Sequence, residues 1–201
     1  TAAGYRQAII MVEAQAGQNL TQVYLNERHS ASSQTYGTGW LDVAIASSST
    51  VDLRITGFSG VTHPMLERFT CDASLTSVGP SFSQSYALRS VSLDTSSVTN
   101  FTAMFQSCPS LQTVPALNTA AGTNFTNMFQ SCYSLQQSDI TGTKYTISYA
   151  SANLSAAALN NIYTKLGTAA GAQTITVTSN WGTAGDDPTI ATAKGWTVAG
   201  S

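Results

Sequence analysis

Charged residues are scarce in this chain. Asp, Glu, Lys and Arg make up 9% of its 201 residues, and the formal net charge is −2. A typical soluble domain carries about 25% charged residues. So weak a field attracts neither nucleic acid nor an anionic membrane, and we expect neither as a partner. Ser, Thr, Asn and Gln fill the polar surface instead, a composition typical of β-rich proteins on virions, on cells or in the extracellular medium.

Long apolar runs are also missing. No stretch of about 18 apolar residues is present, so we expect no insertion into a membrane. The chain does not open on a charged segment followed by an apolar one. Either a secretion signal has been removed, or none was needed.

Residues that carry metal or catalytic chemistry are few. The three cysteines show neither a CxxC pair nor zinc-ligand spacing with histidine. His29 and His63 have no motif partner, and no glycine-rich phosphate loop is present. Asp186 and Asp187 suit a carboxylate pair or a calcium site, but a helix cap before Pro188 explains Asp187 better. We therefore predict no catalytic residue, no metal and no cofactor.

What the chain does have is an internal repeat. Residues 99–112 return as residues 123–136 with only two differences, so that Phe101 corresponds to Phe125. A weaker third copy covers residues 82–91. A period of this length is typical of a stacked array, in which each unit buries its apolar face against the next.

The apolar residues of one unit predict its local structure. Phe101, Met104, Phe105 and Cys108 follow the spacing of one face of a short helix. Residues 111–117 then predict an extended stretch, in which Pro115 keeps the strand short because it cannot lie within a fully paired sheet. Cysteines at equivalent positions of adjacent units would lie about 4.8 Å apart with parallel Cβ vectors, which disfavours a disulfide. We expect buried, unpaired thiols.

Residues 94–111 resemble the BspA-like leucine-rich repeat, which reads roughly D-T-S-x-V-T-N-M-x-x-M-F-x-x-C-x-S-L. The core of that motif occurs twice, and the resemblance extends over roughly the last two-thirds of the chain. It implies an α/β fold, a short solenoid of parallel strands plus short helices. It also implies a place on bacterial surface proteins or phage virion proteins such as tail fibres, and it brings no catalytic residue.

The flanking segments complete the predicted organisation. Residues 1–60 contain four predicted strands, 7–13, 20–26, 40–46 and 51–55, interpreted as a small antiparallel β domain or cap. Residues 61–144 hold the repeats, with a junction at 63–69. Residues 145–201 read as C-terminal α/β repeats and a cap, in which Asn153 or Ser155 starts a helix and Gly167 ends it. The interval between predicted strands at 174–178 and 196–198 is close to the repeat period, which indicates that the period persists there.

One column of residues indicates a binding surface. Tyr86, Pro109 and Tyr133 hold the same repeat position, next to polar pairs. The candidate binding residues are Tyr86, Arg89, Gln112, Tyr133 and Gln136. Rings beside hydrogen-bonding groups suit sugars or protein loops, although ordinary turn residues would give the same pattern.

Three functions compete. The first is a non-enzymatic virion protein, either receptor-binding and tail-fibre-like or capsid-decorating. The second is a bacterial cell-surface adhesin. The third, a polysaccharide-active enzyme, needs converging carboxylates that the repeats do not supply. Expected partners are other virion or surface proteins and a host protein or glycan, and a homo-oligomer stays open. The expected location is a virion or an extracellular surface.

Overall fold

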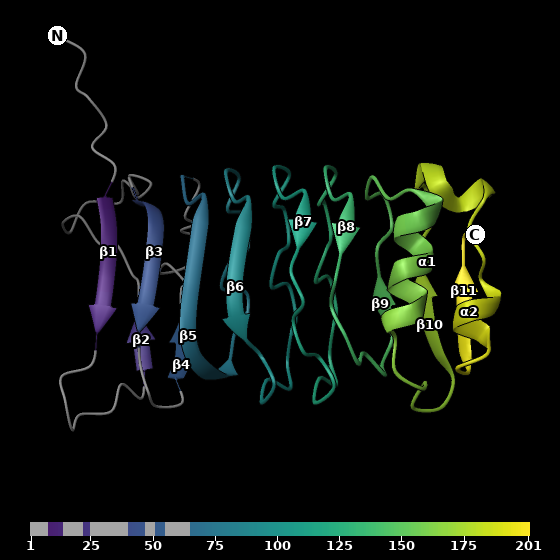
Figure 1. The fold of residues 1–201 in the computed structure, drawn as a ribbon, viewed down its shortest axis with the longest axis horizontal. Helices are drawn as coiled ribbons and strands as arrows, with labels where there is room; N and C mark the ends of the chain where they lie inside the picture. Colours follow the sequence, from purple (N-terminus) through teal and green to yellow (C-terminus); the bar gives the residue numbers. More distant parts are fainter. Residues whose placement is uncertain (1–7, 14–21, 25–39, 47–50, 55–64) are drawn as a thin grey trace, which may run out of the picture.

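The computed structural model describes residues 8–13, 22–24, 40–46, 51–54 and 65–201. It is a mixed α/β structure with small parallel sheets and few helices. Its elements follow one another almost in chain order along the long axis of the molecule (Figure 1). Among the described residues, no helix has the length and apolarity needed to cross a membrane.

The first sheet contains six strands, in the order β1-β3-β5-β4-β2 with β6 beside β5. These strands are β1 (Ala8–Glu13), β2 (Gln22–Tyr24), β3 (Trp40–Ala46), β4 (Val51–Arg54), β5 (Arg68–Ser77) and β6 (Ser90–Asp94). The four predicted N-terminal strands are confirmed as strands, but their antiparallel pairing is wrong. Every pairing in this sheet is parallel.

The parallel pairing has a simple reason. Antiparallel strands can be joined by a tight turn, whereas parallel neighbours need a longer return path. Each of the first two strands pairs with the next strand but one along the chain, since β1 pairs with β3 and β2 pairs with β4. The long strand β5 then pairs with β3 through its first half and with β4 through its second half. The predicted junction at 63–69 therefore contains the start of β5. Through this strand, residues after the predicted boundary at residue 60 pair with strands before it.

Two further sheets follow. One pairs β7 (Thr113–Val114) with β8 (Gln137–Ser138), and the other has the order β11-β10-β9. The strands of the last sheet are β9 (Ile147–Ser148), β10 (Gln173–Thr176) and β11 (Trp196–Ala199). All of these pairings are parallel as well. Ile175 pairs with Val198, which confirms that the two predicted C-terminal strands hold equivalent positions.

The predicted short helix from Phe101 to Cys108 is wrong. These residues form consecutive hydrogen-bonded turns, as in the bond from the Met104 N–H to the Phe101 carbonyl (3.2 Å). Ala103 and Ser107 have positive φ angles of 55° and 58°. A turn with a left-handed third residue brings its first and fourth side chains to one side, so it gives the same apolar spacing as a helix.

The left-handed residues allow hydrogen bonding between units. We name residues 99–122 unit B, residues 123–144 unit C and residues 145–172 unit D. The N–H groups of Phe101, Ala103, Phe105 and Ser107 in unit B donate to carbonyls of unit C over 2.7–3.0 Å. In a helix these groups would bond along the helix axis instead. The turns thus allow hydrogen bonds between neighbouring units that a helix would not form.

Side chains behind these turns form ladders along the core. Phe82, Phe105, Phe129 and Tyr149 stack in succession, with ring centroids 5.7, 5.8 and 4.8 Å apart. Leu88, Leu111 and Leu135 are each fully buried in the same core cluster, as the repeat predicts.

The cysteines are free and buried, which confirms the expectation of unpaired thiols. Cys108 donates from Sγ to the Phe82 carbonyl (2.9 Å), and Cys132 donates to the Phe105 carbonyl (3.0 Å). Burial raises the pKa of both thiols, that of Cys132 to about 12. They stay protonated and act as small apolar groups with one weak donor.

The C-terminal region contains α1 (Ala156–Lys165), a 3-10 helix η1 (Trp181–Ala184) and α2 (Thr189–Thr192). Ser155 Oγ accepts from the Ala158 N–H and caps α1, as predicted. Asp187 Oδ1 accepts from the Thr189 N–H at the start of α2 (3.1 Å), which supports the capping interpretation. Neither the repeat nor its resemblance predicted η1.

Because Leu111 is fully buried, Leu111→Asp should unfold the repeats, as it buries an unpaired charge at a cost of several kcal/mol. The exposed neighbour Gln112 supplies the control. Gln112→Asp should leave stability within about 0.5 kcal/mol. Thermal unfolding followed by circular dichroism measures both. A Leu111→Asp protein with the parental melting temperature would contradict the shared core.

The left-handed turn residues give a second prediction. Ser107→Val should destabilise the chain by about 1–2 kcal/mol, because a β-branched residue fits poorly at positive φ. Ser110→Val, at a nearby turn residue without a positive φ, should change stability by less than about 0.5 kcal/mol. Urea titration of both variants is the measurement. Equal stabilities would argue for a helical conformation at this position.

Candidate functional site

The predicted binding residues are all exposed. Tyr86 and Tyr133 are 48% and 60% exposed, and Arg89, Gln112 and Gln136 are exposed as well. This confirms their predicted exposure, while their role in binding stays a prediction.

The structure brings these residues together only in part. The Gln136 N–H donates to the Gln112 carbonyl over 2.8 Å, so these two residues are neighbours across adjacent units. Tyr86 and Tyr133 are two units apart with Pro109 between them, a separation of about 10 Å if each unit adds about 4.8 Å. The two rings therefore belong to one column without stacking on each other. Tyr133 also borders a groove.

The groove runs between units C and D. It consists of two adjoining cavities of about 390 and 370 Å³ that share Asn127 and Ser148. Tyr133, Ser131 and Ser151 line the first cavity, and Tyr145, Thr123 and Gln173 line the second, among other residues. Together they form one groove along the turn side of the molecule. We name residues 123–133 the donor wall and residues 145–151 the acceptor wall.

The donor wall carries backbone N–H groups that lack partners. In unit B, four equivalent N–H groups bond to unit C. In unit C, the N–H groups at the same positions find no acceptor among the described residues. They belong to Phe125, Asn127, Phe129 and Ser131. Backbone donors without protein partners are sites where water or a ligand must supply the acceptor.

The acceptor wall presents the opposite groups. Ser148 pairs with Thr176 in the parallel ladder of β9 with β10. The Tyr149 and Ser151 N–H groups donate to β10 and the residues after it, at 2.8 and 2.9 Å. The C=O and N–H of one peptide group point in opposite directions. The carbonyls of Ser148 and Ala150, which share peptide groups with these two N–H groups, therefore point away from β10 and toward the groove.

The groove opens because a helix replaces a strand. Unit C contributes β8 to one side of the molecule, whereas unit D contributes α1 there (Figure 1). A helix with its side chains is about 10 Å across, roughly twice the spacing of paired strands. The sequence interval between successive stacked rings also changes between units C and D. The repeat that relates Phe105 to Phe129 would place the next ring at Asn153, but the ring that stacks on Phe129 is Tyr149. The backbones on the turn side therefore no longer meet in register.

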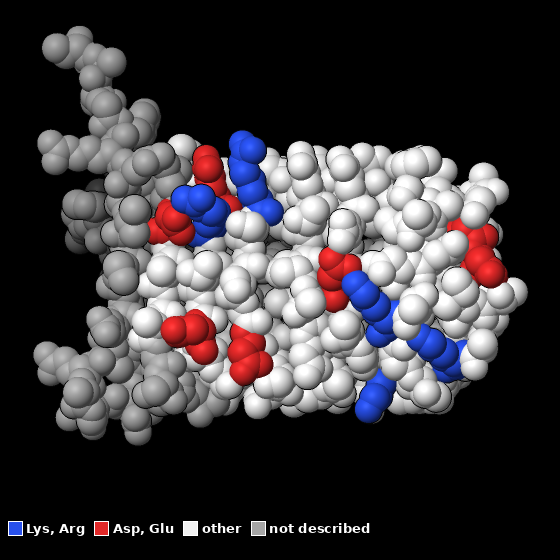
Figure 2. Space-filling model, viewed as in Figure 1, with Lys and Arg blue, Asp and Glu red and all other residues white. Residues whose placement is uncertain are grey.

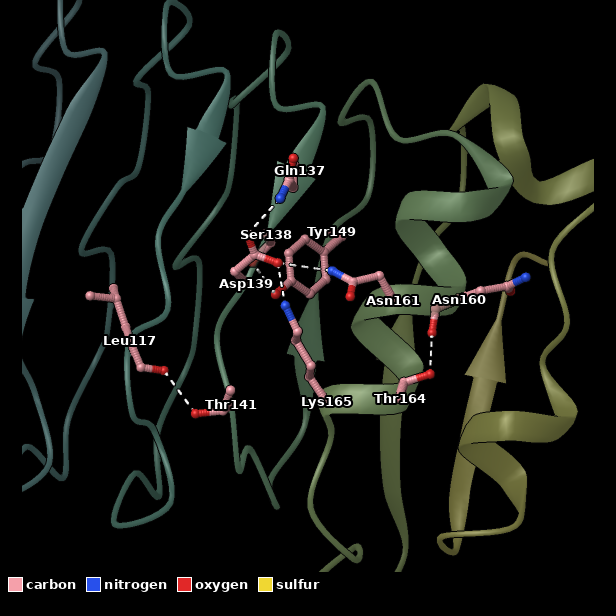
Figure 3. Close-up of polar contacts among 10 residues, drawn as sticks. All are labelled: Leu117, Gln137, Ser138, Asp139, Thr141, Tyr149, Asn160, Asn161, Thr164 and Lys165. Atoms are coloured by element: carbon pink, nitrogen blue, oxygen red, sulfur yellow. Dashed lines mark hydrogen bonds and ion pairs between the residues drawn. The ribbon is translucent and has the colours of Figure 1, made fainter.

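Polar contacts hold α1 against β8 (Figure 3). Asp139 forms an ion pair with Lys165 and accepts from Asn161 Nδ2 (3.0 Å) and Gln137 Nε2 (2.5 Å). The Lys165 ammonium, with smaller contributions from these two amides, lowers the pKa of Asp139. Near neutral pH the carboxylate is thus charged and fully engaged. These contacts connect α1 to β8 and the residue that follows it.

Below the groove the core is closed. The rings of Phe129 and Tyr149 stack across the seam, and the Tyr149 hydroxyl lies 3.0 Å from Ser138 Oγ. Burial raises the pKa of the Tyr149 phenol, so it stays neutral. The groove is therefore a surface feature above a filled core, and Phe129 lines its first cavity.

The groove is uncharged. None of the side chains that line either cavity is acidic or basic. Figure 2 shows the opposite face, the one with β5 to β8 and α1, where charged groups gather over β5 and β6 and around the helices. Hydroxyl, amide and ring groups are thus what the groove on the turn side offers a ligand.

The remaining candidates for chemistry are not assembled into a site. His29 and His63 lie outside the described residues. In the part of the chain that the structure describes, no group of three or more His, Cys, Asp or Glu could hold a metal ion. Asp186 and Asp187 do not form a pair, since Asp186 accepts from the Tyr163 hydroxyl (2.6 Å) and Asp187 caps α2.

Sequence reasoning found Tyr133 but missed the rest of the groove, including Asn127, Tyr145 and Ser148. One signal was available. The repeat does not return after Gln136, so the next unit had to differ. That break indicates where stacking changes, although it does not show that the backbones separate.

Hydrogen exchange tests whether the four N–H groups of the donor wall lack hydrogen-bond partners. The N–H groups of Phe125 and Ser131 should exchange at least about tenfold faster than those of Phe101 and Ser107, their bonded equivalents in unit B. Amide exchange followed by NMR on the folded chain gives all four rates. Equal protection in units B and C would mean that the N–H groups of unit C are also hydrogen-bonded, across the groove.

Comparison with known proteins gives one match. Residues 76–161, less than half of the chain, match the family model described as "Mycoplasma protein of unknown function, DUF285". Neither the curated proteins nor the solved structures give a match. The segment that contains the repeats and both walls of the groove is therefore similar to this family.

Proposed function

We propose that this chain is a non-enzymatic recognition protein of a virion, either receptor-binding and tail-fibre-like or capsid-decorating. In this proposal its architecture is a short solenoid of BspA-like leucine-rich repeats. The molecule acts by binding through an uncharged face, and its partners are other virion proteins and a protein or glycan on a host cell.

The repeated ladder supports the solenoid. Adjacent units are joined by parallel strand pairs, by turn-to-turn hydrogen bonds and by stacked rings at equivalent repeat positions. Units that contact only their neighbours in this way are typical of solenoid proteins. The family match covers residues 76–161, the part of this chain that contains the repeats.

The observation that carries the binding function is the exposed Tyr133 at the edge of an uncharged groove. Its hydroxyl contacts only Ser131 Oγ (3.2 Å) among the described residues, so the ring is not held by the core. An exposed tyrosine offers a large contact area at low entropic cost, and nearby Gln side chains both donate and accept.

The described carboxylates favour binding over catalysis. Asp139 is paired with Lys165, Asp94 accepts from Ser74, and Asp186 accepts from Tyr163. Each is used to connect neighbouring units. Glycoside hydrolysis requires two carboxyl groups that face one substrate, and no carboxylate lines either cavity of the groove.

A bacterial cell-surface adhesin is the alternative. The family description names a bacterial genus, Mycoplasma, and this observation favours a cell surface over a particle. Antibody labelling of the native protein distinguishes the two, because label on virions supports the first proposal and label on cell envelopes supports the second.

Replacing both rings tests recognition. Tyr86→Ala combined with Tyr133→Ala should weaken attachment of the purified chain to its cells or particles by at least about tenfold, because two exposed anchors are lost. The melting temperature should stay unchanged. Trp181→Ala is the control, since this ring is 69% exposed but lies outside the column. Unchanged attachment of the double variant would show that the tyrosines are ordinary turn residues. Hydrolysis of a polysaccharide that a single carboxylate substitution abolishes would overturn the non-enzymatic proposal.

A further inference from the structure

The geometry of the groove points to a ligand class. We infer that the groove between units C and D binds an uncharged polypeptide segment of a partner protein, in the turn conformation of a repeat unit, through backbone hydrogen bonds. This inference deepens the proposed recognition function and rests on it, since it names what one part of the recognition face binds.

The spacing of the donors fits a polypeptide. The N–H groups without partners among the described residues belong to every second residue, from Phe125 to Ser131. Their equivalents in unit B bond to the carbonyls of a polypeptide that runs parallel to them, at every second residue from Asn124 to Gln130. The same row of donors in unit C therefore matches the carbonyl spacing of another parallel polypeptide.

The two walls of the groove present different backbone groups. The donor wall offers N–H groups, while the carbonyls of Ser148 and Ala150 face the groove from the other side. A polypeptide in this groove would turn its carbonyls to the donor wall and its N–H groups to the acceptor wall. Each repeat unit likewise donates from its N–H groups to one neighbouring unit and accepts at its carbonyls from the other. Adding a strand to unpaired backbone is an established mode of peptide recognition.

This asymmetry favours a peptide over a glycan. Sugar hydroxyls both donate and accept, so a glycan needs no separation of donors and acceptors between two walls. The groove has this separation in its backbone, which is fixed by the fold.

The floor and the lining restrict the side chains of the peptide. Phe129 lines the first cavity, and its ring stacks on the buried Tyr149 ring 4.8 Å away, so the core beneath this cavity is filled. Side chains that face inward must therefore be small, such as Gly, Ala or Ser. Because no charged group lines the groove, a charged side chain there would lose water without gaining a partner. Tyr133 and Tyr145, at the two ends, can cover the outward side chains.

The test uses a defined set of synthetic peptides. They are uncharged, acetylated and amidated, about ten residues long to span the donor wall, with Gly, Ala or Ser alternating with Thr, Asn, Gln or Tyr. Binding to the full chain is measured by NMR. A supporting result is binding that protects the Phe125, Asn127, Phe129 and Ser131 amides from exchange. N-methylation at alternate peptide residues should abolish that binding.

Two variants locate the site. Ser148→Arg fills the groove from an exposed position and should weaken peptide binding by at least about tenfold. Thr176→Arg, at the register partner of Ser148 on β10, lies outside both cavities and should bind as the parent does. Unchanged amide spectra away from the substitution show that both variants are folded.

Other outcomes overturn the inference. A panel of neutral oligosaccharides is titrated in parallel. Protection of the same amides by an oligosaccharide, with no peptide effect, would replace the peptide by a glycan and leave the recognition function standing. Concentration-dependent protection without any ligand would assign the groove to a second copy of the chain. No protection under any condition would remove the groove as a binding site, whereas attachment lost only in the tyrosine double variant would still support recognition.

Discussion

Backbone hydrogen bonding between successive units is the interaction on which the structure depends. Each unit is too thin to bury its own apolar side chains, so its core exists only where a neighbour lies at the spacing of paired strands. The left-handed residues Ala103 and Ser107 make this possible, because they turn alternate N–H groups toward the next unit. The strain of these residues, about 1–2 kcal/mol each, is offset by bonds that would otherwise be lost.

The candidate site arises where this bonding is interrupted. On one side of the molecule, α1 takes the place of a strand and is fixed to β8 by Asp139 and Lys165. On the other side, four N–H groups of unit C are left without partners among the described residues. Stacked rings keep the core continuous beneath them. A local mismatch between helix and strand thus produces a polar groove without exposing the apolar core.

Much of the fold could be predicted from local patterns. The alternating residues at 40–46 and 51–55 predicted strands, Ser155 predicted the cap of α1, and the repeat period predicted that Ile175 and Val198 are equivalent. The antiparallel pairing of the first strands was wrong, because strand patterns contain no information about direction. The helix at Phe101–Cys108 was wrong because two consecutive turns and two helical turns place apolar residues at the same spacing.

The sequence by itself determined the repeat, the buried side chains and the exposure of Tyr86 and Tyr133, since these follow from the period and from the chemistry of each residue. Only the tertiary structure decided which backbone groups stay unpaired. The N–H groups of Phe101 and Phe125 have nearly the same local sequence, yet the first is bonded and the second has no partner in the part of the chain that the structure describes. The difference lies in the next unit, where a helix about 10 Å across replaces a strand, and no pattern within the repeat reports that separation.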